Sequence, residues 1–467
     1  MKIEQIYTGC LAQGAYYILS DGEVAIIDPL REVQPYIDRA TKDNAKIKYV
    51  FETHFHADFV SGHIDLSAKT GAPIVYGPNA NPSFTATIAN DGQIFKLGQL
   101  SIKVLHTPGH TMESTCFLLI DESGKDHALF SGDTLFLGDV GRPDLAQKSE
   151  SMTQDDLAGL LYDSLNAKIM PLGDDVIVYP AHGAGSACGK NMMKETVDTL
   201  GNQKKMNYAL NQPNKEEFVK AVTDGLLPPP SYFGLNVAMN KTGYQSFDTV
   251  LLNGLRPLSV NEFEISADLN NAIILDTREP AIFYKGFIPR SINIGIKGDF
   301  APWVGAIIKD VKQPILLVTQ PGLEEETITR LSRVGFDHVL GYLKGSFEAW
   351  QVSNKEIDTV NRITASQFAA EVDLKTDSII DVRKESEYNL DHVNEAFNMP
   401  LDQINDWFTK LNSNKTLFIH CAGGYRSMIA ASIFKLRGFH QFKEIEGGFK
   451  AIAEVTVNMP NFISTLN

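Results

Sequence analysis

The chain has few cysteines, few basic residues and no long apolar run. Its 467 residues include four cysteines, which lie far apart and form no C-x-x-C pair. Such a sparse set suits a reducing compartment, where a cysteine either fills space or takes part in chemistry. No run approaches the ~20 apolar residues that a membrane helix needs, and the N-terminal residues lack the apolar stretch of a signal peptide. We therefore expect a cytoplasmic protein that does not enter a membrane.

Basic residues are outnumbered by acidic ones. Lys and Arg total 42 against 57 Asp and Glu, which gives a net charge of −15. This balance argues against a nucleic-acid-binding surface. The apolar fraction of 43% is ordinary for a globular protein and permits sizeable cores. At roughly 100–200 residues per domain, the length predicts about two to four domains.

Three histidines and an aspartate crowd the stretch Glu52–His63. An apolar run at 47–51 predicts a strand that leads into it. His54, His56 and Asp58 then alternate in a turn, with a third histidine beyond them. Imidazole and carboxylate groups are metal ligands, and a short turn at a strand end can aim several of them at one point. A single histidine usually has only a structural role, but this density favours a metal site.

Three further turns carry groups of the same kind after short apolar runs. They are His106–His110, Ser131–Asp133 and Tyr179–His182, whose glycines and prolines permit tight turns in which side chains converge. Between the apolar runs lie helical patterns, as at 33–42 and 155–165. The alternation predicts sheets layered against helices.

Taken in order, the motifs H-x-H-x-D, P-G-H-T, S-G-D-T and P-A-H-G resemble those of the metallo-β-lactamase superfamily. The resemblance predicts a domain over residues 1–250. It implies an αββα sandwich with a metal at the open edge between two sheets. The candidate ligands that it implies are His54, His56, Asp58, His110, Asp133 and His182.

One position departs from the superfamily hydrolases that hold two zinc ions. Those proteins commonly carry a histidine directly after the aspartate of the first motif, and this chain has Phe59 there. His63 follows four residues later and need not point inward, so we expect a single metal. The persulfide dioxygenase branch of the superfamily holds one non-haem iron, and the resemblance assigns its ligands to His54, His110 and Asp133.

Two histidines and one carboxylate suit Fe(II), because they leave coordination positions open. We therefore expect one Fe(II) per chain. The same resemblance leaves three side chains to orient the ligands from outside the coordination sphere: His56, Asp58 and His182.

The segment Phe136–Leu145 resembles, through its G-R-x-D pattern, the loop that borders the substrate pocket of persulfide dioxygenases. Arg142 is expected either to neutralise an anionic persulfide or sulfite, or to pair with Asp144 in a structural contact. Cys188, six residues after His182, is expected near the same pocket. There it would be a small apolar side chain or a sulfur carrier.

The second half of the chain repeats itself: Leu275–Arg278 returns 105 residues later as Ile380–Arg383. Two copies that alternate strands and helices predict two similar α/β domains, at 256–352 and 358–467. Asp-x-Arg after a strand, together with a later cysteine loop, resembles the rhodanese sulfurtransferase family. The predicted fold class is thus an αββα sandwich followed by two rhodanese-like α/β domains.

In the second copy an expected strand leads into Cys421-Ala-Gly-Gly-Tyr-Arg426 and then into a helix. A thiol at this place faces backbone N–H groups and the positive end of the helix dipole, which favours the thiolate. Arg426 adds a positive charge, and Gly423 and Gly424 let the loop amides curl around a bound persulfide beside Tyr425. Related phosphatases have one more residue in this loop, so the shorter loop favours sulfur transfer.

The first copy has Gln320 at the cysteine position and the acidic run Glu324–Glu326 where a cation is expected. It cannot form a cysteine persulfide. We expect it to be a spacer or an assembly surface, and we expect the chain to form a homo-oligomer.

The domain order resembles bacterial persulfide dioxygenase–sulfurtransferase fusions. The expected reactions are oxidation of a low-molecular-weight thiol persulfide by O2 to sulfite and thiol, and transfer of sulfane sulfur through Cys421 to sulfite, which gives thiosulfate. One alternative is a zinc-dependent thioester hydrolase like glyoxalase II, fused to a sulfurtransferase. The other is a non-enzymatic sulfur-carrier scaffold.

Overall fold

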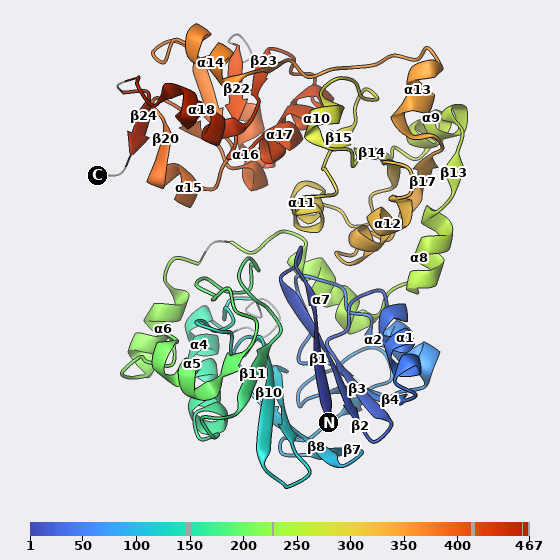
Figure 1. Cartoon of the computed structure of the whole chain (residues 1–467), viewed down its shortest axis with the longest axis vertical. Coiled ribbons are helices and arrows are strands. Elements are labelled where there is room, and N and C mark those ends of the chain that lie inside the picture. The colour runs from blue at the N-terminus through green and yellow to red at the C-terminus, as the bar shows by residue number, and fades with distance from the viewer. Residues whose placement is uncertain (146–151, 227, 412–415, 460, 466–467) are drawn as a thin grey trace. The chain divides into compact units, whose positions relative to one another are not determined.

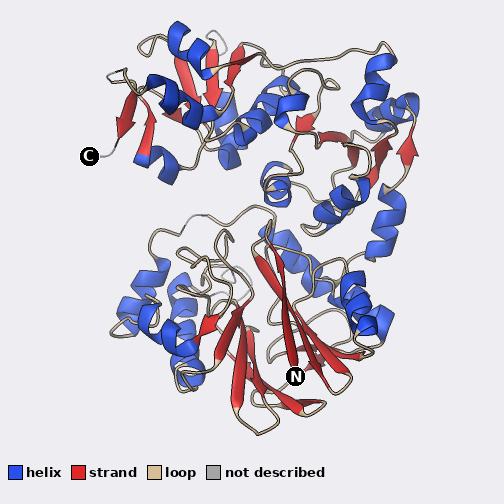
Figure 2. Cartoon of the chain, in the orientation of Figure 1, coloured by secondary structure: helices blue, strands red, loops and turns tan. Residues whose placement is uncertain are grey.

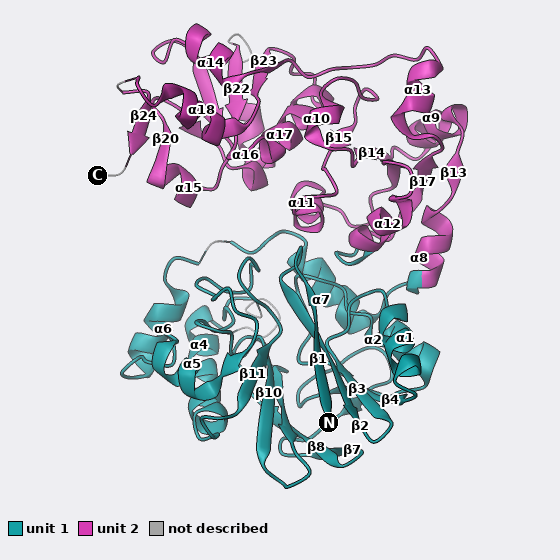
Figure 3. Ribbon diagram, viewed as in Figure 1, with its two compact units in different colours: residues 1–247, 332–335 teal, residues 248–331, 336–467 magenta. Residues whose placement is uncertain are grey.

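The chain divides into two compact units in its computed structural model, which describes residues 1–145, 152–226, 228–411, 416–459 and 461–465 (Figure 3). The first unit holds residues 1–247 together with 332–335, and the second holds the remainder. The domain boundaries expected at 250, 256 and 358 stay predictions, and the expected last residue, 467, lies outside the described residues.

The first unit contains two six-stranded sheets with helices outside them (Figures 1 and 2). One sheet has the order β1-β2-β3-β4-β5-β6 and the other β12-β11-β10-β9-β8-β7. Their strands are β1 (Lys2–Thr8), β2 (Gln13–Ser20), β3 (Glu23–Ile27), β4 (Lys46–Phe51), β5 (Ile74–Tyr76), β6 (Thr87–Ile88), β7 (Ile94–Leu97), β8 (Leu100–His106), β9 (Thr115–Ile120), β10 (Asp126–Gly132), β11 (Ile177–Pro180) and β12 (Asp198–Thr199).

The sequence predicts two helices of the first unit, at 33–42 and 155–165, and these are α1 (Gln34–Lys42) and α4 (Gln154–Ser164). The other helices are α2 (His63–Thr70), the π-helix η1 (Leu165–Ile169), α5 (Leu200–Met206), α6 (Lys215–Thr223) and α7 (Phe233–Thr242), with α8 (Phe247–Gly254) leading into the second unit.

The side chains of strand β2 pack against other elements on both faces of its sheet. Its side chains alternate: Tyr16 and Ile18 join a core cluster with residues of the second sheet, whereas Ala15 and Tyr17 join a cluster that includes residues of α1 and α2. A third cluster lies between the second sheet and α4, α5 and α6. The unit is therefore an αββα sandwich, which confirms the predicted fold class.

The second unit contains two five-stranded parallel sheets, ordered β13-β17-β16-β14-β15 and β18-β23-β22-β19-β21, and a small β20-β24 pair. The two repeated sequence segments form strands that pair with their neighbours in the same way. Asp276 of β14 pairs with Val318 of β16, and Asp381 of β19 pairs with His420 of β22. Both copies are parallel α/β domains, as predicted.

The first copy comprises β13 (Pro257–Leu258), α9 (Val260–Leu269), β14 (Ile273–Asp276), α10 (Pro280–Phe283), β15 (Ile292–Asn293), α11 (Phe300–Ile307), β16 (Ile315–Val318), α12 (Glu324–Ser332), β17 (Val339–Leu343) and α13 (Ser346–Val352). The second comprises β18 (Arg362–Ile363), α14 (Ala365–Glu371), β19 (Ser378–Asp381), α15 (Glu385–Leu390), β20 (Asp391–Val393), β21 (Phe397–Asn398), η2 (Leu401–Gln403), α16 (Ile404–Trp407), η3 (Phe408–Lys410), β22 (Leu417–His420), α17 (Tyr425–Leu436), β23 (Phe442–Ile445), α18 (Gly448–Thr456) and β24 (Ile463–Thr465). Within the described ranges, none of these helices has the length and apolar content that crossing a membrane requires.

Candidate functional site

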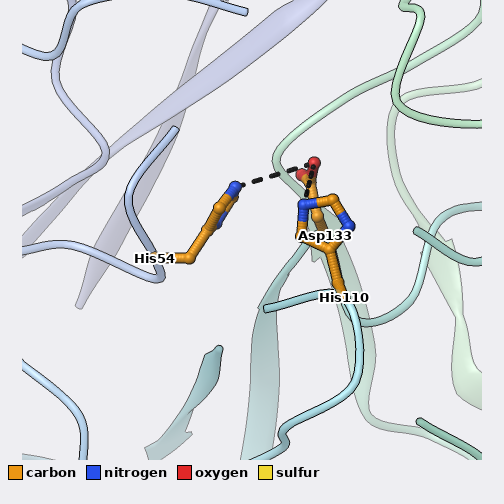
Figure 4. Close-up of side chains that lie close together, drawn as sticks. All are labelled: His54, His110 and Asp133. Atoms are coloured by element: carbon orange, nitrogen blue, oxygen red, sulfur yellow. Dashed lines mark ion pairs between the residues drawn. The ribbon is translucent and has the colours of Figure 1, made fainter. Parts of the chain in front are cut away.

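Three strand-end turns of the first unit bring His54, His110 and Asp133 together (Figure 4). His54 follows β4, His110 follows β8 and Asp133 follows β10 directly. The Nε2 atoms of His54 and His110 lie 3.8 and 3.4 Å from Oδ2 of Asp133. All three side chains are buried. These are the three residues that the family resemblance assigns as metal ligands.

The protonation of this cluster fits a metal. Oδ2 of Asp133 is buried and has no hydrogen-bond partner among the described residues. Nδ1 of His110 lies 2.8 Å from the carbonyl oxygen of Arg142. Because a carbonyl only accepts, Nδ1 carries the proton and Nε2 keeps its lone pair. Two imidazoles and one carboxylate are a donor set that suits Fe(II).

Burial and neighbouring charge keep His54 and Asp133 in the form that binds a cation. Burial, with the adjacent His56, lowers the pKa of His54, so its imidazole is neutral. Burial alone would raise the pKa of Asp133, but His182 and His54 outweigh it and hold the pKa below its usual range. Metal binding therefore needs little proton release from these two side chains.

His182 and Asp58 support Asp133 from the side. Nδ1 of His182 lies 2.8 Å from Oδ1 of Asp133, and its Nε2 lies 2.8 Å from Oδ2 of Asp58. Burial opposes protonation of this imidazole, but the two carboxylates raise its pKa well above the usual value. A cationic His182 thus fixes the orientation of Asp133, in the place where the sequence expects an orienting residue.

His56 contacts carboxylates that the sequence did not single out. Its Nε2 lies 3.1 Å from Oδ1 of Asp28 and 3.6 Å from Oε2 of Glu52. Asp28 also accepts hydrogen bonds from the backbone N–H and the hydroxyl of Thr53, at 2.8 Å each. It therefore holds the turn that carries His54. The only sequence signal for Asp28 is its place directly after β3.

Phe59 and His63 do not supply a further ligand. Phe59 is fully buried and its ring centroid lies 4.3 Å from that of His56. His63 begins α2 and contacts Phe84, with ring centroids 5.1 Å apart. It belongs to none of the candidate metal clusters among the described residues.

Cys188 lies beside the site, as expected, and forms a buried cluster with Asp58 and His182. Burial and the nearby carboxylate of Asp58 raise the pKa of the Cys188 thiol well above its usual value. A neutral thiol is a poor nucleophile. Of the two roles considered from the sequence, its environment favours the space-filling one at neutral pH.

Arg142 makes the structural contact that the sequence left as one of two options. Its guanidinium donates to both oxygens of Asp144, at 2.6 and 2.7 Å, and to the carbonyl oxygen of Ala187 at 3.2 Å. Its backbone N–H donates to the carbonyl of Cys188 at 3.0 Å. Together with its carbonyl, which orients His110, these bonds tie the 142–144 loop to the metal ligands.

The second candidate site is the loop between β22 and α17. The Sγ atom of Cys421 accepts a hydrogen bond from the backbone N–H of Gly424 at 3.1 Å, and the side chain is 1% exposed. Gly424 has φ +99°, a left-handed conformation that glycine adopts without strain. Gly423, by contrast, is exposed. The thiol thus lies at the floor of a loop whose rim faces solvent.

The guanidinium group of Arg426 forms an ion pair that the sequence did not indicate. It donates to both oxygens of Glu387 on α15, at 2.6 and 2.7 Å. This hydrogen-bonded pair lowers the pKa of Glu387. The charge expected to stabilise the Cys421 thiolate is therefore shared with a carboxylate, and the backbone N–H of Gly424 makes the direct contact with sulfur.

Tyr425 joins the cysteine loop to the cysteine-less copy. Its hydroxyl donates to the carbonyl oxygen of Gly295 at 2.6 Å. A Cβ placed on Gly298 would lie 2.4 Å from Cζ of Tyr425, so only glycine leaves room for the ring. The copy without a thiol thus helps to hold the loop of the copy that has one.

We expect Tyr425→Phe to destabilise the second unit by about 0.5–1.5 kcal/mol, because Gly295 loses a hydrogen bond while the ring stays in place. Differential scanning calorimetry of the full chain would record this as a lower transition temperature. Tyr208→Phe is the matched control, because Tyr208 donates to Asp139 within the first unit. An equal shift of the same transition in both variants would contradict the assignment.

Two family models match the chain. The model of the metallo-β-lactamase superfamily matches residues 8–182, and that of the rhodanese-like domain matches residues 259–353 and 364–454. Among solved structures, a metallo-β-lactamase from Staphylococcus aureus subsp. aureus COL is 30% identical, with a TM-score of 0.66. The match covers 74% of this chain and 99% of that one.

Curated relatives include two proteins named for the same hydrolase. A hydroxyacylglutathione hydrolase from Francisella philomiragia subsp. philomiragia is 33% identical over 215 residues, which are 45% of this chain and 78% of that protein. A probable hydroxyacylglutathione hydrolase from Schizosaccharomyces pombe is 33% identical over 161 residues, or 34% of this chain. The chain spans 58% of the length of that relative.

The fold, the histidine and aspartate cluster and these matches place the chain in the metallo-β-lactamase superfamily. Within it, the chain is a metallo-β-lactamase domain fused to two rhodanese-like domains.

Proposed function

We propose that the protein oxidises a low-molecular-weight thiol persulfide with O2 and passes sulfane sulfur to sulfite. In the first reaction a persulfide, O2 and water give thiol, sulfite and two protons. In the second, sulfite and a further persulfide give thiosulfate and thiol. The observation that carries the first reaction is the separate His54, His110 and Asp133 cluster, with Phe59 in the position where hydrolases with two zinc ions commonly have a ligand.

In this proposal the chain prepares the first site in three ways. His54, His110 and Asp133 hold one Fe(II), which when bound supplies the O2 chemistry that oxidation of sulfur needs. His182 keeps Asp133 oriented through its 2.8 Å contact. The carbonyl of Arg142 keeps the proton of His110 on Nδ1, away from the metal position.

Cys421 carries the second reaction. Its thiolate attacks the outer sulfur of a persulfide, the bond between the two substrate sulfurs breaks, and the thiol leaves with the electron pair and takes up a proton. Sulfite then attacks the outer sulfur of the cysteine persulfide, which releases thiosulfate and restores the thiolate. The N–H of Gly424, 3.1 Å from Sγ, stabilises the negative sulfur in both steps.

A zinc thioester hydrolase is the second candidate for the first unit. The hydroxyacylglutathione hydrolases among the relatives favour it, as does the buried Asp58, His182 and Cys188 cluster beside the first one. Phe59 weighs against it, because a histidine at that position is what the two-zinc hydrolases commonly use.

Metal exchange separates these two functions. We expect the protein, stripped by a chelator and refilled with Fe(II), to consume one O2 per glutathione persulfide and to release sulfite, whereas the Zn(II)-filled protein consumes none. O2-electrode traces, metal analysis and sulfite quantification provide the readouts. Hydrolysis of S-lactoylglutathione by the Zn(II) form, with no O2 uptake by the Fe(II) form, would favour the hydrolase instead.

A further inference from the structure

A buried ion pair lies behind the cysteine loop. Nε of Arg362 on β18 donates to Oε2 of Glu444 on β23 at 2.7 Å. The Arg362 side chain is 7% exposed and that of Glu444 is fully buried. Burying two charges costs free energy that their mutual attraction often fails to recover, so such a pair is weak evidence for stability alone.

Glu444 is connected to the thiol through one hydroxyl. The Cys421 thiol donates to Oγ of Ser427 at 3.5 Å, and Ser427 donates to Oε1 of Glu444 at 2.6 Å. Both hydrogen bonds point from sulfur toward the carboxylate. The donors are therefore already arranged in the direction in which a proton would leave the thiol.

The two positions of this ion pair carry no charge in the copy without the cysteine. Arg362 pairs in register with Glu444 between β18 and β23. At the equivalent place of the first copy, Pro257 pairs with Tyr342 between β13 and β17. A pair needed only to hold the rhodanese-like fold would be expected in both copies. Its presence beside Cys421 alone links it to the chemistry of the thiol.

The surroundings of Glu444 bring the pKa of its carboxyl group close to neutral pH. Burial raises its pKa to about 7, although Arg362 and Ser427 oppose this shift. Glu446 on the same side raises the pKa further and lies 3.9 Å from Nη1 of Arg362. Arg426, five residues after Cys421 in the chain, is paired with Glu387. A carboxylate in this environment can accept a proton near neutral pH.

We propose that Glu444 is a positioning residue that receives the proton of Cys421 through Ser427 and so controls formation of the thiolate. The S–H bond breaks as its proton moves to Oγ of Ser427, and the hydroxyl proton of Ser427 moves to Oε1 of Glu444. The electron pair stays on sulfur, and no other reactant takes part. The catalytic consequence rests on the proposed sulfur transfer, but the proton movement itself does not.

The test is the rate at which iodoacetamide alkylates Cys421 in the full chain between pH 5 and 10. Cys421→Ser provides the blank for the other cysteines. Because coupled groups titrate in two macroscopic steps, we expect the wild-type rate to rise in two steps. Glu444→Gln and Ser427→Ala should each give a single step. A two-step profile in Glu444→Gln, or a single step in the wild type, would overturn the proposal.

Turnover distinguishes a relay from a packing effect. We expect Glu444→Gln and Ser427→Ala each to lower kcat for thiosulfate formation by about 100-fold, with KM for sulfite unchanged. The double variant should lose no more than the larger single loss. Losses that multiply would show that the two residues act independently, which contradicts the relay.

The double variant Glu444→Gln/Arg362→Met is the control for folding, because it leaves no unpaired buried cation. Circular dichroism should match the wild type, and the alkylation profile should again have one step. A two-step profile in this variant would count against Glu444. If no variant and no wild-type protein formed thiosulfate, the sulfur-transfer function would be wrong, whereas the alkylation profiles would still decide the relay.

Discussion

Asp133→Ala is expected to abolish O2 uptake with a thiol persulfide while thiosulfate formation from supplied sulfite and persulfide continues. Asp133 is the only carboxylate of the candidate iron site, and it also holds His182. Loss of a residue that merely supports a metal ligand costs about 10- to 100-fold in affinity or activity, so loss of the ligand itself should cost more than about 100-fold. An O2 electrode would measure O2 uptake, iron analysis the iron bound, and a thiosulfate assay the second reaction.

Asp133→Asn tests how much of this effect depends on the negative charge, because the amide keeps the shape of the side chain and removes its charge. Asp121→Ala, in the turn between β9 and β10, is the control for substitution of an aspartate at the end of a neighbouring strand and should leave O2 uptake unchanged. If Asp133→Ala retained iron and wild-type O2 uptake, the ligand assignment would be wrong. If it lost thiosulfate formation as well while folded, the two reactions would not be separate.

Cys421→Ser is expected to show the opposite pattern. A serine hydroxyl is a far weaker nucleophile than a thiolate at neutral pH, so sulfur transfer should fall by at least about 1,000-fold. O2 uptake should continue, and sulfite should accumulate in place of thiosulfate. Ion chromatography of both anions during persulfide oxidation would measure the switch.

Cys10→Ser is the matched control for this experiment, because Cys10 lies in the first unit and outside the candidate metal clusters of the described residues. It should leave both products unchanged. Undiminished thiosulfate formation by Cys421→Ser would assign sulfur transfer to another group. Mass spectrometry of the wild type after exposure to persulfide should show one added sulfur on Cys421.

The sequence predicts the parts of these sites that depend on strand ends. His54, His110 and Asp133 each follow an apolar run, which predicts strand-end turns, and the family resemblance assigns the three as ligands. Because β4 belongs to one sheet and β8 and β10 to the other, the packing of the two sheets brings these turns together. The strand-end pattern also locates Cys421 between β22 and α17. The alternation of apolar runs and the repeated Asp-x-Arg segments predict sheets layered against helices and two similar α/β domains, whereas the αββα arrangement is implied by the family resemblance.

Partners that depend on register and side-chain direction could not be predicted. Glu387 and Arg426 lie 39 positions apart, and Arg362 and Glu444 lie 82 positions apart. No local pattern marks such pairs until the strands are aligned. The role of the Arg142 carbonyl is hidden for a different reason, since every residue has a carbonyl and only the tight loop aims this one at His110.

The ring of Tyr425 packs on Gly298 and its hydroxyl donates to Gly295, so it limits which residues the cysteine-less copy can carry at this place. That copy has Gln320 at the position that corresponds to Cys421. At Gly298, even a methyl group would collide with the neighbouring ring. A substitution in the cysteine-less copy can therefore disturb the cysteine loop of the other copy through this one aromatic side chain.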